Sequence, residues 1–347
     1  MSWNMMDLLK YRFYGFSLCL VAIFFLGCKS KGDVWVKNHS TGGALGTSYS
    51  IIYFAKVELD FEKEIDSVFQ AMNRSMSTYV TTSDISKINQ GDATIVVDRM
   101  FQEVFNLSDQ VYMATDGYFD PTVGTLVNAW GFGPGNELKM DSIKVDSLLE
   151  FVGFDKVQLT VENRINKANP NIYFDFNAIA KGYAVDRIAV LLENNGITDY
   201  LIEVGGELVA KGENRMKNKK WVVAIDDPMM GTVRNSRRTV YMKDIALASS
   251  GNYRKYKVDP ETGEKYVHTI DPKSGYTKNS NILAATVMAN TCAKADAFAT
   301  AFMAMDLEKS KGILTTDAEL EGYIVYLDEA GKVMEYLTPG FKAEVIE

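Results

Sequence analysis

The chain has 347 residues, of which 47% are hydrophobic, and its formal net charge is −8 at pH 7. This length and composition allow a large core in one big domain or in two closely packed ones. The acidic balance, without a basic stripe, argues against a nucleic acid as a partner. The sequence also lacks a P-loop and the H-E-x-x-H, C-x-x-C and G-x-S-x-G motifs, which argues against the chemistries they support.

Residues 1–27 have the pattern of a secretory signal. Lys10 and Arg12 precede an apolar run over residues 13–26, which is too short to span a bilayer comfortably. The run is followed by a glycine and Cys28, which resembles a bacterial lipoprotein processing site where Cys28 becomes the lipidated first residue. The alternative is an uncleaved anchor helix with an incidental cysteine; both place the body outside the cytoplasm at a membrane. The expected divisions are a lipoprotein signal over 1–27, a lipid-anchored tether over 28–33 and a functional domain over 34–347.

The patterns that follow predict a mixture of helices and strands. Strands broken by Gly42-Gly43 and by Gly46 are expected between residues 34 and 54. Because the order of helices and strands does not alternate strictly, an α+β fold with mixed sheets and packed helices is favoured over a Rossmann fold. The glycines near residue 131 do not fit G-x-G-x-x-G, since position 136 is Asn. Further helices are predicted over 61–76, 83–89, 99–115 and 291–305, and strands over 200–204, 221–225 and 282–288.

The stretch from Tyr173 to Asp186 organises the rest of the chain. It begins like the end of a strand and continues as a helix, for which Asp175 is the expected cap and Gly196 the stop. Lys181 falls near the start of this helix, where a positive charge opposes the helix dipole unless an anion neutralises it. The alternative is a surface lysine whose stem lies along apolar neighbours.

The last predicted helix carries a second informative pair. Asp296 and Thr300 are four residues apart, so their oxygens project from one helical face. Carboxylate, hydroxyl and backbone carbonyl oxygens suit a hard cation such as Mg²⁺. The alternative is a solvated aspartate and a threonine that bonds back along its own helix.

His268 is the candidate proton acceptor. It stands shortly before Asp271-Pro272, where an extended segment stops, and histidine accepts protons near neutral pH. A structural role is the alternative for a lone histidine. The only other histidine, His39, lies in a polar strand near the expected anchor and is expected to be structural or exposed.

In their order along the chain, these segments resemble the FAD:protein FMN transferase family, also called the ApbE type. The resemblance covers nearly all of the chain after the signal, and the segments around Asp175 and Asp296 are individually specific. It implies an ApbE-like flavin transferase fold and an enzyme that transfers FMN from FAD to a Thr or Ser hydroxyl of an exported protein, with release of AMP. The matching segments are Leu45-Gly46-Thr47, Ser77-Thr78-Tyr79, Asp116 to Gly133, Asp175 to Asp186, Glu203 to Glu207, His268 to Pro272 and Asp296 to Thr300.

The resemblance also implies roles for single residues. It makes the backbone carbonyl of Ala178, with Asp296 and Thr300, the ligands of Mg²⁺, and His268 the general base. Leu45 stands where the family commonly has methionine, an apolar exchange of similar volume that leaves it a weaker contact. FAD contacts are implied for Leu45, Tyr79, Tyr118, Phe119, Asp120, Asp175, Lys181, Ile270 and Ala299.

The chemistry of these residues agrees with such a transfer. Displacement at the phosphorus of the FMN half builds negative charge, which a cation and Lys181 would neutralise. One alternative is the same site with water as acceptor, an Mg²⁺-dependent FAD pyrophosphatase that gives FMN and AMP. Another is a non-catalytic lipoprotein that binds FAD. The resemblance implies, as the flavinylated partner, an exported subunit or domain of a respiratory or electron-transfer complex at a bacterial membrane facing the periplasm.

Overall fold

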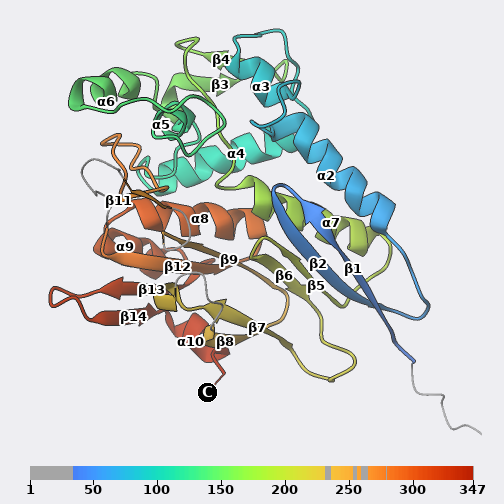
Figure 1. The fold of residues 1–347 in the computed structure, drawn as a ribbon. Coiled ribbons are helices and arrows are strands. Elements are labelled where there is room, and N and C mark those ends of the chain that lie inside the picture. The colour runs from blue at the N-terminus through green and yellow to red at the C-terminus, as the bar shows by residue number, and fades with distance from the viewer. Residues whose placement is uncertain (1–33, 231–235, 253–255, 259–264, 279, 347) are drawn as a thin grey trace, which may run out of the picture.

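The computed structural model describes residues 34–230, 236–252, 256–258, 265–278 and 280–346 (Figure 1). The expected signal, the tether and the lipidation site Cys28 lie outside the described residues. Within these ranges, no helix is both long enough and apolar enough to cross a membrane.

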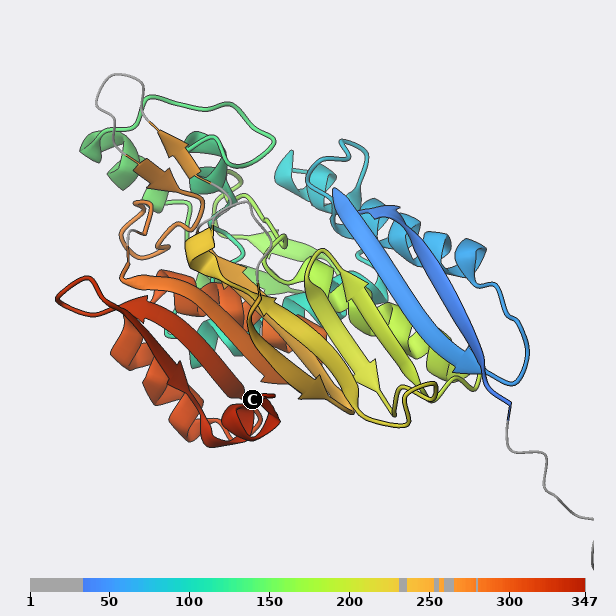
Figure 2. The same cartoon turned by 60° about the horizontal axis from the view of Figure 1, so that its bottom comes forward.

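The centre of the fold is an eight-stranded sheet in which every neighbouring pair of strands is antiparallel. In spatial order its strands are β1 (Val36–Ala44), β2 (Thr47–Ala55), β5 (Tyr200–Val204), β6 (Glu207–Lys211), β9 (Ile245–Gly251), β12 (Ile282–Ala289), β13 (Glu321–Leu327) and β14 (Val333–Leu337). The hairpins β1–β2 and β13–β14 form its two edges (Figure 2). Two-stranded pairs outside this sheet are β3 (Val157–Leu159) with β4 (Ile165–Lys167), β7 (Trp221–Asp226) with β8 (Ser236–Met242), and β10 (Tyr256–Val258) with β11 (Lys265–Val267).

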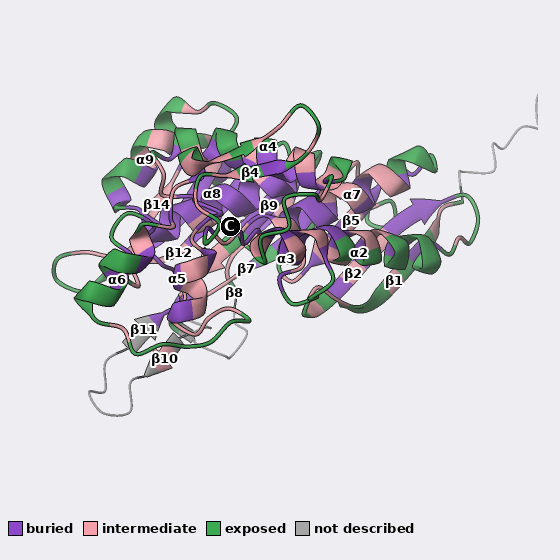
Figure 3. Cartoon of the chain, turned by 90° about the horizontal axis from the view of Figure 1, so that it is seen from above, coloured by how far each residue is buried: buried purple, intermediate pink, exposed green. Residues whose placement is uncertain are grey.

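Helices cover one face of the sheet in two layers (Figure 1). The inner layer is α7 (Ala180–Asn194) and α8 (Cys292–Ala304), which pack on β5, β6, β9 and β12. The outer layer, α2 (Glu62–Met76) and α4 (Arg99–Ala114), packs on α7 and α8, so α8 is buried over most of its length (Figure 3). The remaining helices are α3 (Asp84–Asn89), α5 (Gly124–Ala129), α6 (Ser142–Leu149), α9 (Leu307–Thr316), α10 (Pro339–Glu344) and the short η1 (Phe154–Lys156) and η2 (Pro228–Met230).

The opposite face of the sheet has its own, smaller core. Trp221 and Val240 of the β7–β8 pair and Phe341 of α10 pack there against Leu247 and Tyr323 of the sheet. Because both faces are covered, the central strands are shielded from water on both sides.

The architecture confirms the predicted α+β class and excludes a doubly wound parallel sheet. The helices predicted over 61–76, 83–89, 99–115 and 291–305 each form, with ends within one residue of the prediction. The strands predicted over 200–204, 221–225 and 282–288 form with the same accuracy. Hydrophobic periodicity therefore predicted these elements of the core correctly.

Of the glycines near the N-terminal hairpin, Gly46 breaks the strands as predicted, but Gly42 and Gly43 do not. Gly42 and Gly43 lie inside β1, and the chain turns instead at Leu45-Gly46, where both residues have positive φ (50° and 74°). Gly42 pairs with Tyr49 across the hairpin, and a Cβ on Gly42 would lie 2.7 Å from the Tyr49 ring. The glycine makes room for an aromatic ring rather than ending a strand.

Candidate active site

The first turns of α7 and α8 touch backbone to backbone. A Cβ on Gly182 would lie only 2.4 Å from the carbonyl oxygen of Cys292 and 2.9 Å from Cα of Ala293. Each helix supplies a carboxylate to the other. Asp186 of α7 accepts hydrogen bonds from the backbone N–H groups of Cys292 (2.8 Å) and Ala293 (2.9 Å), and Asp296 of α8 accepts one from Gly182 N–H at 3.1 Å.

This exchange corrects the predicted role of Asp175 as the cap of α7. The helix begins at Ala180 and has no side-chain cap from its own segment. Asp175 instead accepts from the N–H of Asn177 at 2.7 Å, within the turn before the helix. Asp296, 114 residues away from Gly182, serves the helix start in its place, because the close approach of α8 brings a carboxylate to it.

Lys181 does have the anionic partner that its place near a helix start requires. Its ammonium forms a salt bridge with Glu207, the first residue of β6, and 32% of its side chain remains exposed. Burial lowers the pKa of Lys181, but Asp296 and Glu207 outweigh that effect and hold the pKa above its usual value. Sequence reasoning gave Glu207 no role, although an acidic residue directly after paired glycines was a usable signal.

The predicted Mg²⁺ ligands lie beside this ion pair. Asp296 is 3% exposed, and burial raises the pKa of its carboxyl group. One turn further along α8, the Thr300 hydroxyl lies 3.2 Å from that of Ser250 on β9. Ala178 is half-buried in the turn that leads into α7. The structure thus gathers two of the three predicted ligands on one face of α8, with the third in the segment before Gly182.

The donor set fits a hard divalent cation. Asp296 and Glu207 place two carboxylates in a buried setting with a single ammonium, that of Lys181, and burial together with Asp296 raises the pKa of Glu207. A cation would offset this excess of negative charge, and carboxylate and hydroxyl oxygens are its preferred ligands. No group of three or more His, Cys, Asp or Glu side chains within the described ranges could hold a metal. The predicted ligand set includes only one side chain of these types, that of Asp296.

The segment that carries Asp175 is held in place by side chains from distant parts of the chain. The side chain of Asn89 of α3 bonds to both backbone groups of Phe174, as a neighbouring strand would. Its side-chain carbonyl accepts from Phe174 N–H at 2.8 Å, and its side-chain NH₂ donates to Phe174 C=O at 2.9 Å. The N–H of Asp175 donates to the carbonyl of Pro121 at 2.7 Å. The Lys167 ammonium donates to three carbonyls, those of Ile88 (2.9 Å), Pro170 (2.8 Å) and Ile172 (3.0 Å).

The predicted FAD contacts at 118–120 form a tight loop beside that segment. Asp120 accepts from the N–H (2.8 Å) and the hydroxyl (2.6 Å) of Thr122 and from Phe154 N–H (3.2 Å). Burial raises the pKa of Asp120 to about 6. The hydrogen bonds of the Asp120 carboxylate thus stabilise the conformation of the loop. Phe119, 3% exposed, lies in the core.

His268 and Ile270 follow β11 on a segment tied to the rest of the chain. The Thr269 hydroxyl donates to the side-chain carbonyl of Asn252 at 2.7 Å, and Ile270 forms an isolated bridge with Thr277. His268 is half-buried and Ile270 is 6% exposed. The histidine is therefore held on an ordered segment, and its role as the general base stays a prediction.

The remaining predicted contacts are spread more widely. Leu45 lies in the β1–β2 turn, half-buried against the main core, and Ala299 is wholly buried on α8. Tyr79 is 63% exposed, and its pKa is raised by burial and by the charge of Asp175. The contacts of these residues and of Lys181 with FAD, and of Asp296 with Mg²⁺, remain predictions.

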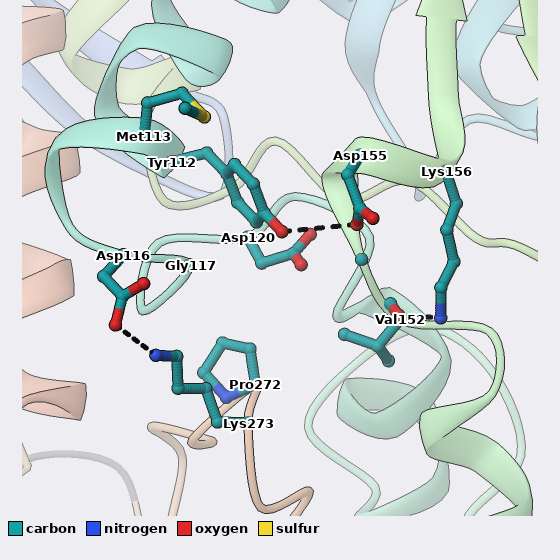
Figure 4. Close-up of a pocket in the computed structure, with 11 residues that line it drawn as sticks. Tyr112, Met113, Asp116, Gly117, Asp120, Val152, Asp155, Lys156, Pro272 and Lys273 are labelled. Atoms are coloured by element: carbon teal, nitrogen blue, oxygen red, sulfur yellow. Dashed lines mark hydrogen bonds and ion pairs between the residues drawn. The ribbon is translucent and has the colours of Figure 1, made fainter.

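A pocket of about 400 Å³ lies between the end of α4 and the turn after His268 (Figure 4). Tyr112 points toward Asp155 in it, with their oxygens 3.3 Å apart, and Asp116 pairs with Lys273 at 2.6 Å. Its lining shares Asp120 and Pro272 with the predicted segments, but Lys181, Asp296 and His268 are not among the residues that line it. The lining residues are Tyr112, Met113, Asp116, Gly117, Asp120, Val152, Gly153, Asp155, Lys156, Pro272 and Lys273.

Comparison with known proteins identifies the class. The sequence matches the model of the ApbE family over residues 45–324. The FAD:protein FMN transferase of Vibrio cholerae is 34% identical over 94% of this chain and 96% of that protein, and the one of Haemophilus influenzae is 33% identical over 83% and 85%. Curated relatives of the chain are thus transferases by name.

Solved structures agree with this class. The flavin transferase ApbE from Vibrio cholerae superposes with a TM-score of 0.80 at 30% identity, covering 90% of this chain and all of that one. The apo form of the flavinyl transferase ApbE from Pseudomonas stutzeri gives 0.79 at 27% identity, covering 89% and 97%. The chain belongs to the ApbE family.

Proposed function

We propose that this protein is an Mg²⁺-dependent FAD:protein FMN transferase. It would join FMN from FAD to a Thr or Ser hydroxyl of an exported target protein and release AMP. Family membership and the names of the relatives support the reaction class. The observation that carries the proposal to this site is the buried group of Lys181, Glu207, Asp296 and Thr300, where one ammonium and two carboxylates meet at the start of α7.

In the proposed reaction, the acceptor hydroxyl forms a bond to the FMN phosphorus while the bond from that phosphorus to the AMP oxygen breaks. A bound Mg²⁺, held by Asp296, Thr300 and the Ala178 carbonyl, would neutralise charge on the pyrophosphate oxygens. The exposed part of Lys181 offers an ammonium to the same oxygens. His268 would take the proton of the hydroxyl, and AMP would leave with the negative charge.

The test uses the chain from residue 29 onward with FAD, Mg²⁺ and an exported acceptor domain. AMP release and in-gel flavin fluorescence of the acceptor are followed together. AMP with a fluorescent acceptor band is the expected result. AMP without labelling, in the presence of an acceptor that a relative does label, would instead identify an FAD pyrophosphatase. Bound FAD with no AMP would identify a non-catalytic flavin-binding protein.

The proposed setting is outside the cytoplasm. The pattern over residues 1–27 supports export and lipid attachment at Cys28 to a bacterial membrane, with the domain facing the periplasm. The proposed partner is a subunit or domain of a respiratory or electron-transfer complex. Incorporation of labelled palmitate into the wild-type chain and its loss in Cys28→Ala would support the anchor, whereas equal labelling of both would contradict it.

A further inference from the structure

Glu207 carries the clearest unsatisfied group near the site. It is 3% exposed, and its Oε1 takes part in the salt bridge with Lys181. Its other oxygen, Oε2, is buried and has no hydrogen-bond partner among the described residues. Buried polar atoms in folded proteins almost always have a partner, and a charged oxygen without one is costly. An oxygen in this state indicates a ligand that the protein alone does not supply.

The surroundings of Oε2 favour a small, positively charged ligand. The turn before Glu207 consists of Gly205 and Gly206, both at positive φ (66° and 109°), so no side chain projects from it. Even a Cβ on Gly205 would come within 3.3 Å of Oε2. A cation or a water molecule needs less room than a side chain would.

The charges of the neighbouring groups point the same way. The Lys181 ammonium is the partner of Glu207 Oε1, and Asp296, 3% exposed, adds a second carboxylate that accepts from the N–H of Gly182, the residue after Lys181. With both carboxylates ionised and Lys181 protonated, the group carries one net negative charge. A divalent cation would reverse that sign and prepare the site for an anionic pyrophosphate.

We propose that Glu207 is a second carboxylate of the cation site, with its partnerless oxygen reserved for the cation or for a water molecule bound to it. The inference rests on the proposed function for the presence of a cation at Asp296. It adds a residue that links the cation to Lys181, because one carboxylate then contacts both. Cation binding would draw charge from Glu207 and leave the Lys181 ammonium more available to phosphate oxygens.

The test measures Mn²⁺ binding to the purified protein by electron paramagnetic resonance, without FAD, so that no turnover is involved. Glu207→Gln keeps the volume and an acceptor for Lys181 but removes the charge. Its Mn²⁺ affinity should fall about 10- to 100-fold, the usual cost of losing a supporting carboxylate. Lys181→Met should bind Mn²⁺ more tightly than wild type, because it removes a positive charge from the same group. Affinity in Glu207→Gln equal to wild type would overturn the inference.

Asp186→Asn is the matched control, since Asp186 is a half-buried carboxylate of the same helix pair and both of its oxygens accept from backbone N–H groups. It should bind Mn²⁺ as wild type does. Equal losses in Asp186→Asn and Glu207→Gln would mean that the helix pair was merely disturbed, which would overturn the inference. If Glu207→Gln does not fold, Glu207→Asp serves instead, with a smaller loss expected and wild-type affinity contradicting it.

The outcomes separate this inference from the proposed function. A wild-type protein that binds Mn²⁺ and transfers FMN, beside a Glu207→Gln variant with unchanged Mn²⁺ affinity, refutes the role of Glu207 alone. A wild-type protein that binds Mn²⁺ with the expected loss in Glu207→Gln, but transfers no FMN, supports the cation site and refutes the transferase. A wild-type protein that binds no Mn²⁺ refutes the cation site and the role of Glu207 together.

Discussion

Asp186, which is half-buried, and Asp296, which is 3% exposed, lie on adjacent helices, and each accepts hydrogen bonding from backbone N–H groups in the first turn of the other helix. Both oxygens of Asp186 are used in this way. Asp296 uses Oδ2 for Gly182 and shares its surroundings with Lys181 and Glu207. The two residues thus share their type and a position opposite the start of the neighbouring helix. What distinguishes Asp296, the proposed cation ligand, from Asp186 is that the charges of Lys181 and Glu207 act on it.

The largest effect is expected from disturbing the close backbone contact between α7 and α8, which allows each helix to bond to a carboxylate of the other. Gly182→Ala would place a Cβ against the backbone of Cys292, which cannot move aside as a side chain can. We expect a loss of about 3 kcal/mol in the free energy of unfolding, measured by urea denaturation. Gly312→Ala on α9 is the control, because nothing lies within 4 Å of a Cβ there. It should be neutral or stabilising by up to about 1 kcal/mol. Similar losses in both variants would contradict the close contact.

Asp296→Asn tests the site half of the comparison. The amide keeps the shape of the side chain but lacks the charge that a cation needs. We expect FMN transfer to fall about 10²-fold or more, with loss of its Mg²⁺ dependence. Initial rates of AMP release across a Mg²⁺ titration provide the measurement. An Asp296→Asn enzyme with wild-type rate and Mg²⁺ response would contradict both the cation site and the contrast with Asp186.

Asp186→Asn tests the structural role of Asp186. The pH dependence of the stability difference from wild type makes this test specific to the Asp186 carboxyl group. Burial raises the pKa of Asp186 to about 7; its hydrogen bonds to Ala293 and Cys292 and the charge of Arg187 lower it, whereas Asp296 raises it. The folded protein therefore binds this proton more tightly than the unfolded chain, whose carboxyl titrates near its ordinary value of about 4. The stabilising contribution is complete below about pH 4 and is lost as the pH rises through 7.

We therefore expect Asp186→Asn to be less stable than wild type by about 1–2 kcal/mol at pH 5, because the hydroxyl oxygen of the protonated carboxyl group can still accept from the second N–H group, whereas the amide NH₂ cannot. At pH 8 the difference should be smaller, because the wild type then has to bury the charge. Other groups titrate alike in both proteins and cancel in the difference. Urea denaturation at the two pH values measures it, and a difference that grows with pH would show that the sign is wrong.

The limits of the sequence are visible in the same residues. Periodicity located both ends of α8 and the C-terminal end of α7 to within a residue or two, because their apolar positions face the core at helical spacing. The start of α7 was predicted four residues too early, after Asp175 instead of at Ala180. The sequence placed the cap of α7 on Asp175, the nearest carboxylate in sequence, because the approach of Asp296 depends on tertiary packing. The sequence did not reveal the role of Glu207 for the same reason, since its salt-bridge partner Lys181 lies on another element 26 residues away. Spacing alone placed Asp296 and Thr300 on one helical face and suggested a cation there. The family resemblance added the Ala178 carbonyl as a third ligand, and all three stay predictions.

The smallest effect sharpens the comparison at the segment before α7. Asn89→Ala removes both hydrogen bonds to Phe174, next to Asp175. We expect a loss of about 1 kcal/mol in unfolding free energy and a rise of a few-fold in the KM for FAD, with kcat changed less, because the segment is loosened while the α7–α8 cluster stays intact. Asn195→Ala is the control: its amide donates to Leu191 C=O at 2.8 Å in an exposed place, so its KM should match wild type. A fall in kcat without a rise in KM would mean that Asn89 supports the reacting groups rather than FAD, and the segment would then belong with Asp296 rather than with Asp186.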